Sequence, residues 1–264
     1  PEQIIFTSGA TEAIQSAIFS VLQAARSQAK SRPKASLLYG ATEHKAVPQA
    51  LHHWVSALGL PFEVIELPVD AEGQIIQEAL RRELPNALMV CTMAVNNETG
   101  VIQNLGSIEK ALIESGSNAR WLVDCVQALG KVKLQLASSR IDYAPFSGHK
   151  LYAPKGIGFL YARKDAPLTP LIVGGGQERG QRSGTENLPG VAAFGAVLEL
   201  LVGETVTPFQ PHAKQIEFRD RLIAELKRAF PKVEFNTPFE TSVPTTINFS
   251  VPGFSSKELL DLFD

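Results

Sequence analysis

The sequence predicts an α/β fold with a mostly parallel β-sheet. Short runs of apolar and β-branched residues alternate with segments of helical periodicity, a pattern that builds βαβ units. Residues 87–93 are apolar almost throughout, as expected for a strand buried on both faces. Of the 264 residues, 44% are hydrophobic and 20% are charged, which is the composition of a globular protein with a sizeable core.

The alternation is most regular in the first 150 residues. Strands are expected at residues 4–7, 35–39, 61–67, 87–93, 121–124 and 143–146. Between them, apolar residues recur at every third or fourth position, which predicts helices from residue 11 to about 29 and at 47–58, 75–84 and 105–113.

The pattern changes after Lys150. Only a short loop precedes the next predicted strand, residues 157–161, whereas a parallel connection needs a dozen residues or more. We therefore expect this strand to run antiparallel to its neighbour or to lie at the sheet edge. An apolar helix at 188–201 follows, with Pro189 tolerated in its first turn.

Residues 205–211, which contain two prolines, are the best candidate for a linker. The prediction is a large domain over residues 1–203 and an incomplete small α+β domain over 204–264. The small domain would contain one amphipathic helix, strands at 233–235 and 246–251, and a helix that starts at Ser256. The apolar face of the amphipathic helix consists of Ile216, Leu222, Ile223, Leu226 and Phe230.

Composition excludes several classes of protein. Lys and Arg total 25 against 27 Asp and Glu, a net charge of −2, so no basic excess is present to hold a nucleic acid backbone. Cys91 and Cys125 alone cannot make a disulfide framework, and they indicate a reducing, cytoplasmic location. No apolar run approaches the roughly 20 residues of a membrane span. Because the chain opens at Pro1 without Met and stops at Asp264 inside a helical pattern, we expect it to be cut at both ends.

Two segments have the character of anion sites. Residues 8–11 lie where a strand leads into a helix, and free N–H groups at a helix start attract phosphate. Ser and Thr also favour such positions as ordinary helix caps, and taken alone this alternative is the better one. Residues 174–184 hold five glycines and two arginines, which suggests a second anion-binding loop, or else a solvated connection.

Three further side chains are predicted at strand ends. Lys150 lies just beyond a strand, where α/β sheets bind ligands and where burial would lower its pKa. Asp124 ends an apolar strand, and His44 follows another. Asn97 lies in a turn-rich loop. Each has an ordinary alternative, as a surface or turn residue, but the set matches what pyridoxal phosphate needs: an amine for a Schiff base, a carboxylate for the ring nitrogen, a flat group over the ring, and phosphate donors.

At this point the sequence resembles the cysteine desulfurases of the NifS/IscS type, which are fold-type I pyridoxal-phosphate enzymes of the class V aminotransferase group. Six motifs occur in the same order as in that family and span residues 4 to 190. They are FTSGATE at 6–12, TEHKAV at 42–47, NNETG at 96–100, DCVQ at 124–127 with GK at 130–131, SGHK at 147–150 with PKG at 154–156, and GGGQERGQRSGTEN at 174–187.

The resemblance implies a three-layer αβα sandwich and a role for each matching residue. Lys150 would form the Schiff base and shuttle the α-proton, and His44 would stack on the ring and assist proton transfer. The other cofactor contacts would be made by Ala10, Thr11, Asn97, Asp124, Gln127, Ser147, His149 and, from a partner subunit, Thr185. Of these, Asp124 would hold the ring nitrogen, Gln127 the phenolic oxygen, and Asn97 would lie near the substrate carboxylate or the ring. No metal is implied.

The implied reaction converts L-cysteine to L-alanine in a homodimer. A protein thiol takes the sulfur as a persulfide, for iron–sulfur or thio-cofactor assembly through an acceptor or scaffold protein. Family members carry that cysteine, and an arginine for the substrate carboxylate, in a C-terminal region that would follow Asp264. The alternatives are a cysteine, cystine or selenocysteine lyase of the same fold, and a non-catalytic dimerising homologue.

Overall fold

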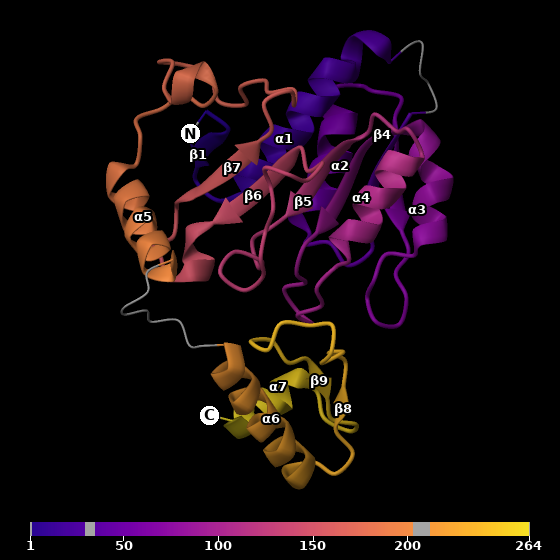
Figure 1. Ribbon diagram of the computed structural model, residues 1–264, viewed down its shortest axis with the longest axis vertical. Coiled ribbons are helices and arrows are strands. Elements are labelled where there is room, and N and C mark those ends of the chain that lie inside the picture. Colours follow the sequence, from indigo (N-terminus) through magenta and orange to yellow (C-terminus); the bar gives the residue numbers. More distant parts are fainter. Residues whose placement is uncertain (1, 30–34, 203–211, 264) are drawn as a thin grey trace.

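A seven-stranded β-sheet forms the centre of the computed structural model, which describes residues 2–29, 35–202 and 212–263 (Figure 1). The strand order is β1-β7-β6-β5-β4-β2-β3. β2, β3, β4, β5 and β6 run parallel, and β7 is antiparallel to both of its neighbours, β6 and β1. The predicted α/β fold with a mostly parallel sheet is confirmed.

The strands and helices alternate as the hydrophobic pattern predicts. The strands of the large sheet are β1 (Ile4–Thr7), β2 (Ser36–Gly40), β3 (Glu63–Leu67), β4 (Ala87–Met93), β5 (Arg120–Asp124), β6 (Tyr143–Ser147) and β7 (Gly158–Ala162). The helices between and after them are α1 (Ala10–Ala25), α2 (Ala46–Ala57), α3 (Gln77–Glu83), α4 (Leu105–Glu114) and α5 (Leu188–Val202). Short 3₁₀ turns occur at η1 (Arg26–Gln28), η2 (Leu84–Asn86), η3 (Gly148–Leu151) and η4 (Glu178–Gly180).

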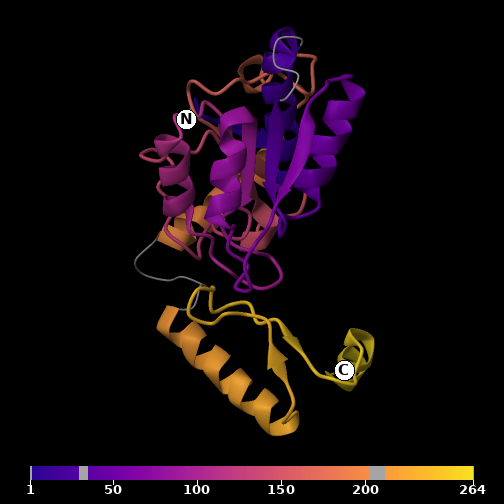
Figure 2. The ribbon, with the colours of Figure 1, turned by 90° about the vertical axis from the view of Figure 1, so that its right-hand side faces the viewer.

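Helices cover both faces of the sheet and make three layers (Figures 1 and 2). On one face, α1 and α2 bury a core with alternate strand residues such as Leu37 and Leu122. On the other face, α3 and α4 pack over Leu38 and Trp121. Strand residues that are adjacent in sequence point to opposite faces, so both sides of the sheet need apolar residues.

The end of the sheet formed by β7 and β1 departs from the parallel pattern, as the short loop before residue 157 predicts. Ile4 faces Tyr161 and Thr7 faces Gly158 in the antiparallel pair. β7 lies between β6 and β1, so it is antiparallel without being an edge strand. α5 closes this end of the molecule, where its Phe194 packs against Phe159 with ring centroids 5.6 Å apart.

The C-terminal elements form a smaller group beside the large sheet (Figures 1 and 2). They are α6 (His212–Ala229), β8 (Glu234–Phe235), β9 (Phe249–Ser250) and α7 (Ser256–Phe263), with β8 and β9 antiparallel. Backbone hydrogen bonds dock this group on the loop after β4: Ile102 N–H donates to Thr241 O (2.8 Å) and Val243 N–H donates to Gly100 O (2.9 Å).

Several predicted boundaries were wrong at their ends. α1 stops at Ala25 and continues as the 3₁₀ turn η1, rather than reaching residue 29. The strands predicted at 233–235 and 246–251 shorten to two residues each, because β8 and β9 pair only at Glu234–Ser250 and Phe235–Phe249. The proposed linker at 205–211 and the domain boundary after residue 203 lie outside the described residues, so the two-domain division stays a prediction.

In the part of the chain that is described, no helix combines the length and apolar character needed to cross a membrane.

Candidate active site

A pocket of about 420 Å³ opens at the edge of the sheet where β1, β2, β4, β5 and β6 end. Because these strands run in the same direction, the loops after them meet at this edge. Nine of the ten side chains predicted for the site line this pocket. They are Ala10, Thr11, His44, Asn97, Asp124, Gln127, Ser147, His149 and Lys150.

One end of the pocket is the start of α1. The helix begins at Ala10 after Gly9, whose φ of 150° is a conformation that favours glycine, and no described side chain caps it. The N–H groups of Ala10 and Thr11 therefore face the pocket with the positive end of the helix dipole behind them. This end of the pocket suits an anion.

Hydroxyl and cationic groups surround the same end. Ser147 Oγ and His149 Nδ1 are 2.9 Å apart, and Lys150 and Lys155 also line the pocket. Partial burial and then the positive charges of Lys150 and Lys155 lower the pKa of His149. A neutral His149 ring can share a hydrogen bond with Ser147 while the lysines supply the positive charge.

Glu12, in the first turn of α1, would repel an anion here, but Arg182 neutralises it. Arg182 Nε and Nη2 donate to the two Glu12 oxygens at 2.8 and 3.1 Å, and Ser8 N–H donates to Oε2 at 2.8 Å. Burial acts to raise the pKa of Glu12, yet the hydrogen bonds from Arg182 and Ser8 lower it overall. The bidentate pair also pins the glycine-rich segment to α1.

A buried carboxylate also lines the pocket. Asp124, at the end of β5, is only 6% exposed, and its Oδ1 accepts a hydrogen bond from Val126 N–H at 3.0 Å. Burial raises the pKa of Asp124, whereas the Val126 hydrogen bond and the nearby His44 oppose that rise. A buried carboxylate with one oxygen uncommitted is suited to pair with a cationic N–H group on a ligand.

His44 lies on the loop after β2, next to Glu43. Ala46 N–H donates to His44 Nδ1 at 3.2 Å, which makes Nδ1 an acceptor and leaves the proton of the neutral ring on Nε2. Glu43 anchors the loop, because Met93 N–H at the end of β4 donates to Glu43 Oε1 at 2.6 Å. Burial, and then the charge of Asp124, raise the pKa of Glu43 well above its ordinary value.

Lys150 is carried by η3, directly after β6. Tyr152, which follows this turn, adopts a left-handed conformation with φ of 66°. The Lys150 side chain is exposed, so the expected burial of this residue is not found in the chain. Its position instead leaves the amine accessible from the pocket.

Asn97 and Gln127 reach the pocket from two neighbouring loops. Asn96, next to Asn97, ties its loop to the His44 loop, because Asn96 Nδ2 donates to Thr42 O at 3.0 Å. Gln127 lies on the turn after β5, and its Oε1 accepts from Lys131 Nζ at 2.6 Å. Both loops are thus held by side chains that do not line the pocket.

Thr185 is the one predicted site residue that the chain does not bring to the pocket. It is exposed on the glycine-rich segment, outside the pocket lining. Its role in a partner's site stays a prediction.

Several residues around the site make contacts that the sequence alone does not predict. Glu12, Glu43 and Lys131 all lie within the quoted motifs, yet no role was predicted for them. Their spacing from predicted site residues indicates that they lie near the site: Lys131 follows Gln127 by four residues, and Glu43 directly precedes His44. Arg182 was noted only as a possible anion ligand, whereas the structure pairs it with Glu12.

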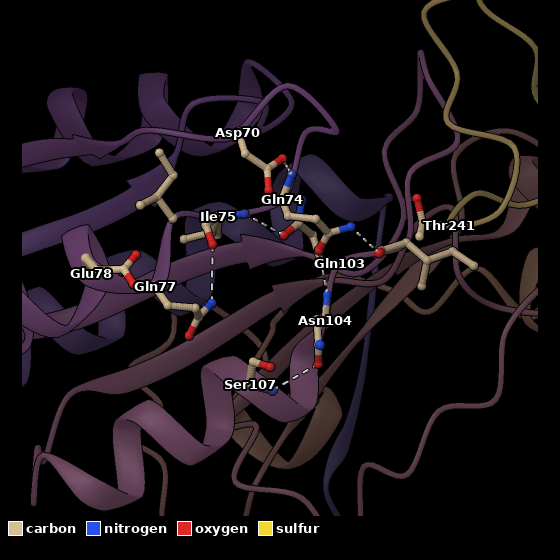
Figure 3. A pocket seen from close by; sticks show the side chains of 11 residues that line it. Asp70, Gln74, Ile75, Gln77, Glu78, Gln103, Asn104, Ser107 and Thr241 are labelled. Atoms are coloured by element: carbon tan, nitrogen blue, oxygen red, sulfur yellow. Dashed lines mark hydrogen bonds between the residues drawn. The ribbon is translucent and has the colours of Figure 1, made fainter.

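A larger hollow of about 750 Å³ lies elsewhere on the same sheet edge, between the segment after β3 and the start of α4 (Figure 3). Its amide side chains bind the backbone: Gln74 Nε2 donates to Ile102 O at 2.8 Å, and Gln103 Oε1 accepts from Ile75 N–H at 3.2 Å. Among the described residues that line it there is no Lys, Arg, His or Cys. The smaller pocket therefore has the chemically richer lining.

The described part of the chain contains no group of three or more His, Cys, Asp or Glu side chains that could hold a metal ion. Cys91 and Cys125 are both free and buried. Burial raises the pKa of each thiol well above its ordinary value, with the charges of Glu43 and Asp124 adding to the effect. Neither thiol has the exposure or the low pKa of a reactive cysteine.

The chain is similar to known cysteine desulfurases. It is 36% identical over 259 residues to a cysteine desulfurase of Nostoc sp., covering 98% of this chain and 61% of that protein. It is 33% identical over 260 residues to the cysteine desulfurase IscS of Dictyoglomus turgidum, covering 98% of this chain and 63% of that relative. The chain thus spans about three fifths of the length of these curated relatives.

Solved structures and a family model agree with these similarities. A NifS-like protein superposes with a TM-score of 0.89 at 34% identity, covering all of this chain and 69% of that one. DndA from Streptomyces lividans superposes with a TM-score of 0.84 at 32% identity, covering all of this chain and 72% of that one. SspA, solved in complex with cysteine, superposes with a TM-score of 0.76 at 30% identity, covering all of this chain and 70% of that one. The model of the aminotransferase class-V family matches residues 1–264. The chain belongs to the aminotransferase class-V family.

Proposed function

We propose that this chain binds pyridoxal 5'-phosphate in the pocket of about 420 Å³ and is the cofactor-binding part of a cysteine desulfurase. The observation that carries the proposal is the convergence of Lys150, Asp124 and His44 on one pocket that the uncapped start of α1 also lines.

The residues present fit this cofactor. Ala10 and Thr11 N–H, with Ser147 and His149, offer donors for a phosphate, and Lys155 adds positive charge. Asp124 would hold the ring nitrogen, and Gln127 the phenolic oxygen. His44 and Asn97 would contact the ring and the substrate. The buried Asp124 supports this assignment, because a cationic N–H group of the ligand would offset the cost of burying its carboxylate.

When bound, pyridoxal phosphate supplies an electron sink that stabilises negative charge on the α-carbon of an amino acid. The chain supplies the acid–base groups. Lys150 would provide the amine that binds the cofactor aldehyde, and would then take and return the proton at the substrate α-carbon. His44, with its ring proton on Nε2, would assist that transfer.

The proposed substrate is L-cysteine. In the balanced reaction, L-cysteine and a protein thiol give L-alanine and a protein persulfide. The names of the relatives, and the cysteine bound in the SspA structure, support this choice. Since Cys91 and Cys125 are buried, we assign the acceptor thiol to neither of them.

The proposal extends to a homodimer and to a sulfur-accepting protein partner in the cytoplasm. The exposure of Thr185 supports a role in a second subunit, as does the exposure of apolar residues of α5 such as Leu188 and Val202. Iron–sulfur assembly is the proposed destination of the sulfur.

The first test replaces Lys150 with Ala. The wild-type chain mixed with pyridoxal phosphate is expected to develop a visible absorption band, and borohydride reduction should leave the cofactor mass on the peptide that contains Lys150. The variant should show neither. An unchanged band in the variant would overturn the site assignment.

The activity test uses the whole protein with L-cysteine. Alanine as the product supports desulfuration. Pyruvate and ammonia would instead identify a lyase of the same fold. A chain that takes up no cofactor would support a non-catalytic homologue.

A further inference from the structure

Gln127 has a partner that fixes which way its amide faces. A side-chain amide has an accepting oxygen and a donating NH₂ group, and rotation by half a turn exchanges the two. In the structure, Gln127 Oε1 accepts from Lys131 Nζ at 2.6 Å. Lysine can only donate, so the contact is satisfied by the oxygen alone and leaves Nε2 for the pocket.

The turn after β5 places Lys131 for this contact. Ala128 N–H donates to Cys125 O, and Lys131 N–H donates to Ala128 O, both at 3.0 Å. Gly130 has a φ of 77°, and a Cβ there would lie 3.1 Å from Leu151 on η3. The close approach that glycine allows sets the turn against the element that carries Lys150.

Lys131 is not an ordinary surface lysine. It is half-buried, and within the described residues it forms no ion pair, so Gln127 is its polar partner. Burial, and then the positive charge of Lys150, lower the pKa of Lys131. By contrast, Lys133 is exposed two residues further on. Partial burial of a cation without a carboxylate partner costs free energy. Stability alone therefore does not explain why Lys131 is placed against the Gln127 amide.

We propose that Lys131 is a positioning residue that holds the Gln127 amide with Nε2 toward the pocket, where it donates to an anionic oxygen of the ligand. This inference rests on the proposed function, in which the anionic oxygen is the phenolic oxygen of pyridoxal phosphate. Without Lys131 the Gln127 amide can turn its Oε1 toward the pocket. Oε1 and the phenolic oxygen of the ligand, both acceptors, would then face each other.

The test is a double-mutant cycle in the full chain with Lys131→Met, Gln127→Leu and the double variant. Lys133→Met is the matched control. Cofactor affinity is measured by titration of the visible band, together with the pH at which that band shifts. Loss of one hydrogen bond predicts an affinity about tenfold lower for Lys131→Met and for Gln127→Leu. The double variant should be no weaker than Gln127→Leu alone, because Lys131 acts through Gln127.

The pH of the band shift separates orientation from simple stability. A donor to the phenolic oxygen favours its anionic form, so the shift should move to higher pH in Lys131→Met and in Gln127→Leu, and stay at its wild-type value in Lys133→Met. Wild-type behaviour of Lys131→Met, or effects that add in the double variant, would overturn the inference and leave the proposed function intact. Absence of a band in the wild-type chain would overturn the proposed function, and the inference with it.

Discussion

At the scale of single residues, Glu43 joins the two sides of the site. Its Oε1 holds the end of β4 through Met93 N–H, whereas its Oε2 is buried and has no hydrogen-bond partner within the described residues. A lone buried carboxylate oxygen of this kind is costly when charged. The raised pKa of Glu43 follows from that burial and from the charge of Asp124.

Glu43→Gln should therefore stabilise the cofactor-free chain at high pH. The pKa of Glu43 in the folded chain is above its ordinary value of 4.5, so its stabilising contribution is complete below pH 4.5 and is lost as the pH rises through the folded pKa. Glutamine keeps the acceptor for Met93 N–H without the charge. The gain in melting temperature should be near zero at pH 4 and should grow toward pH 9.

Glu63→Gln is the control, since Glu63 is exposed on β3. Its melting temperature should follow that of the wild type at every pH. A Glu43→Gln variant that loses stability as the pH rises would show that the Glu43 carboxylate is needed in its charged form.

The residue scale also separates what the sequence could reveal from what it could not. Asp124, Lys150 and His44 were predictable because each follows a strand, and parallel strands end at one edge. The contacts of Glu43 and Arg182, by contrast, depend on how segments far apart in the sequence pack on each other. Arg182 meets Glu12 across 170 positions of chain, and no local pattern specifies that pairing.

At the scale of elements, β7 lies close against the start of α1. A Cβ on Gly158 would lie 2.4 Å from Phe146 O and 2.7 Å from Gly9 Cα, both of which are backbone atoms. Backbone cannot move aside as a flexible side chain can. The packing of β6 against β7 and the position of the turn before α1 therefore both require that residue 158 has no side chain.

Gly158→Ala should lower the free energy of unfolding by about 3 kcal/mol, the upper part of the range for overpacking. It should also weaken phosphate binding, because Gly9 must shift. Thermal unfolding and a titration with pyridoxal phosphate measure the two effects.

Gly195→Ala is the matched control on α5. A Cβ there meets no atom within 4 Å, so the better helix propensity of alanine should raise stability by about 0.5–1 kcal/mol. Equal melting temperatures of Gly158→Ala and wild type would contradict the close packing.

Element type was more predictable than element length. The short loop before residue 157 limited β7 to an antiparallel or an edge position, since loop length limits connection geometry, and the structure shows the antiparallel one. The β-rich run at 246–251 looked longer than β9, because the extent of a strand depends on its partner, and β8 pairs at only two positions. Hydrophobic periodicity carries no information about that limit.

At the scale of the whole molecule, hydrogen bonds hold the glycine-rich segment in place, and its exposed Thr185 lies outside the pocket of its own chain. Arg179 Nη2 donates to Ile4 O at 2.8 Å, and Glu178 accepts from Phe6 N–H at 3.2 Å. Both residues have positive φ, a conformation that non-glycine residues rarely adopt. A segment fixed in this way can present Thr185 to a second subunit.

Hybrid dimers test that arrangement. Thr185→Ala should weaken cofactor binding about tenfold, as expected for one charge-assisted hydrogen bond. Chains carrying Thr185→Ala and chains carrying Lys150→Ala, mixed with different tags, should form hybrids with one intact site. That site should regain wild-type affinity by band titration. A hybrid that keeps the weak affinity of Thr185→Ala would place Thr185 in its own subunit's site.

The pairing of β1 with β7 also sets an order of assembly. Ile4 faces Tyr161, so the strand that leads into the turn before α1 gains its partner only after most of the large sheet has been synthesised. Contacts between positions so distant in sequence carry a high loop-closure cost, and they form slowly unless the intervening parts are already folded. During synthesis, the α1 end of the pocket should therefore be completed after its Asp124 side, and the nascent chain should acquire ligand-binding ability late and abruptly, when β7 leaves the ribosome.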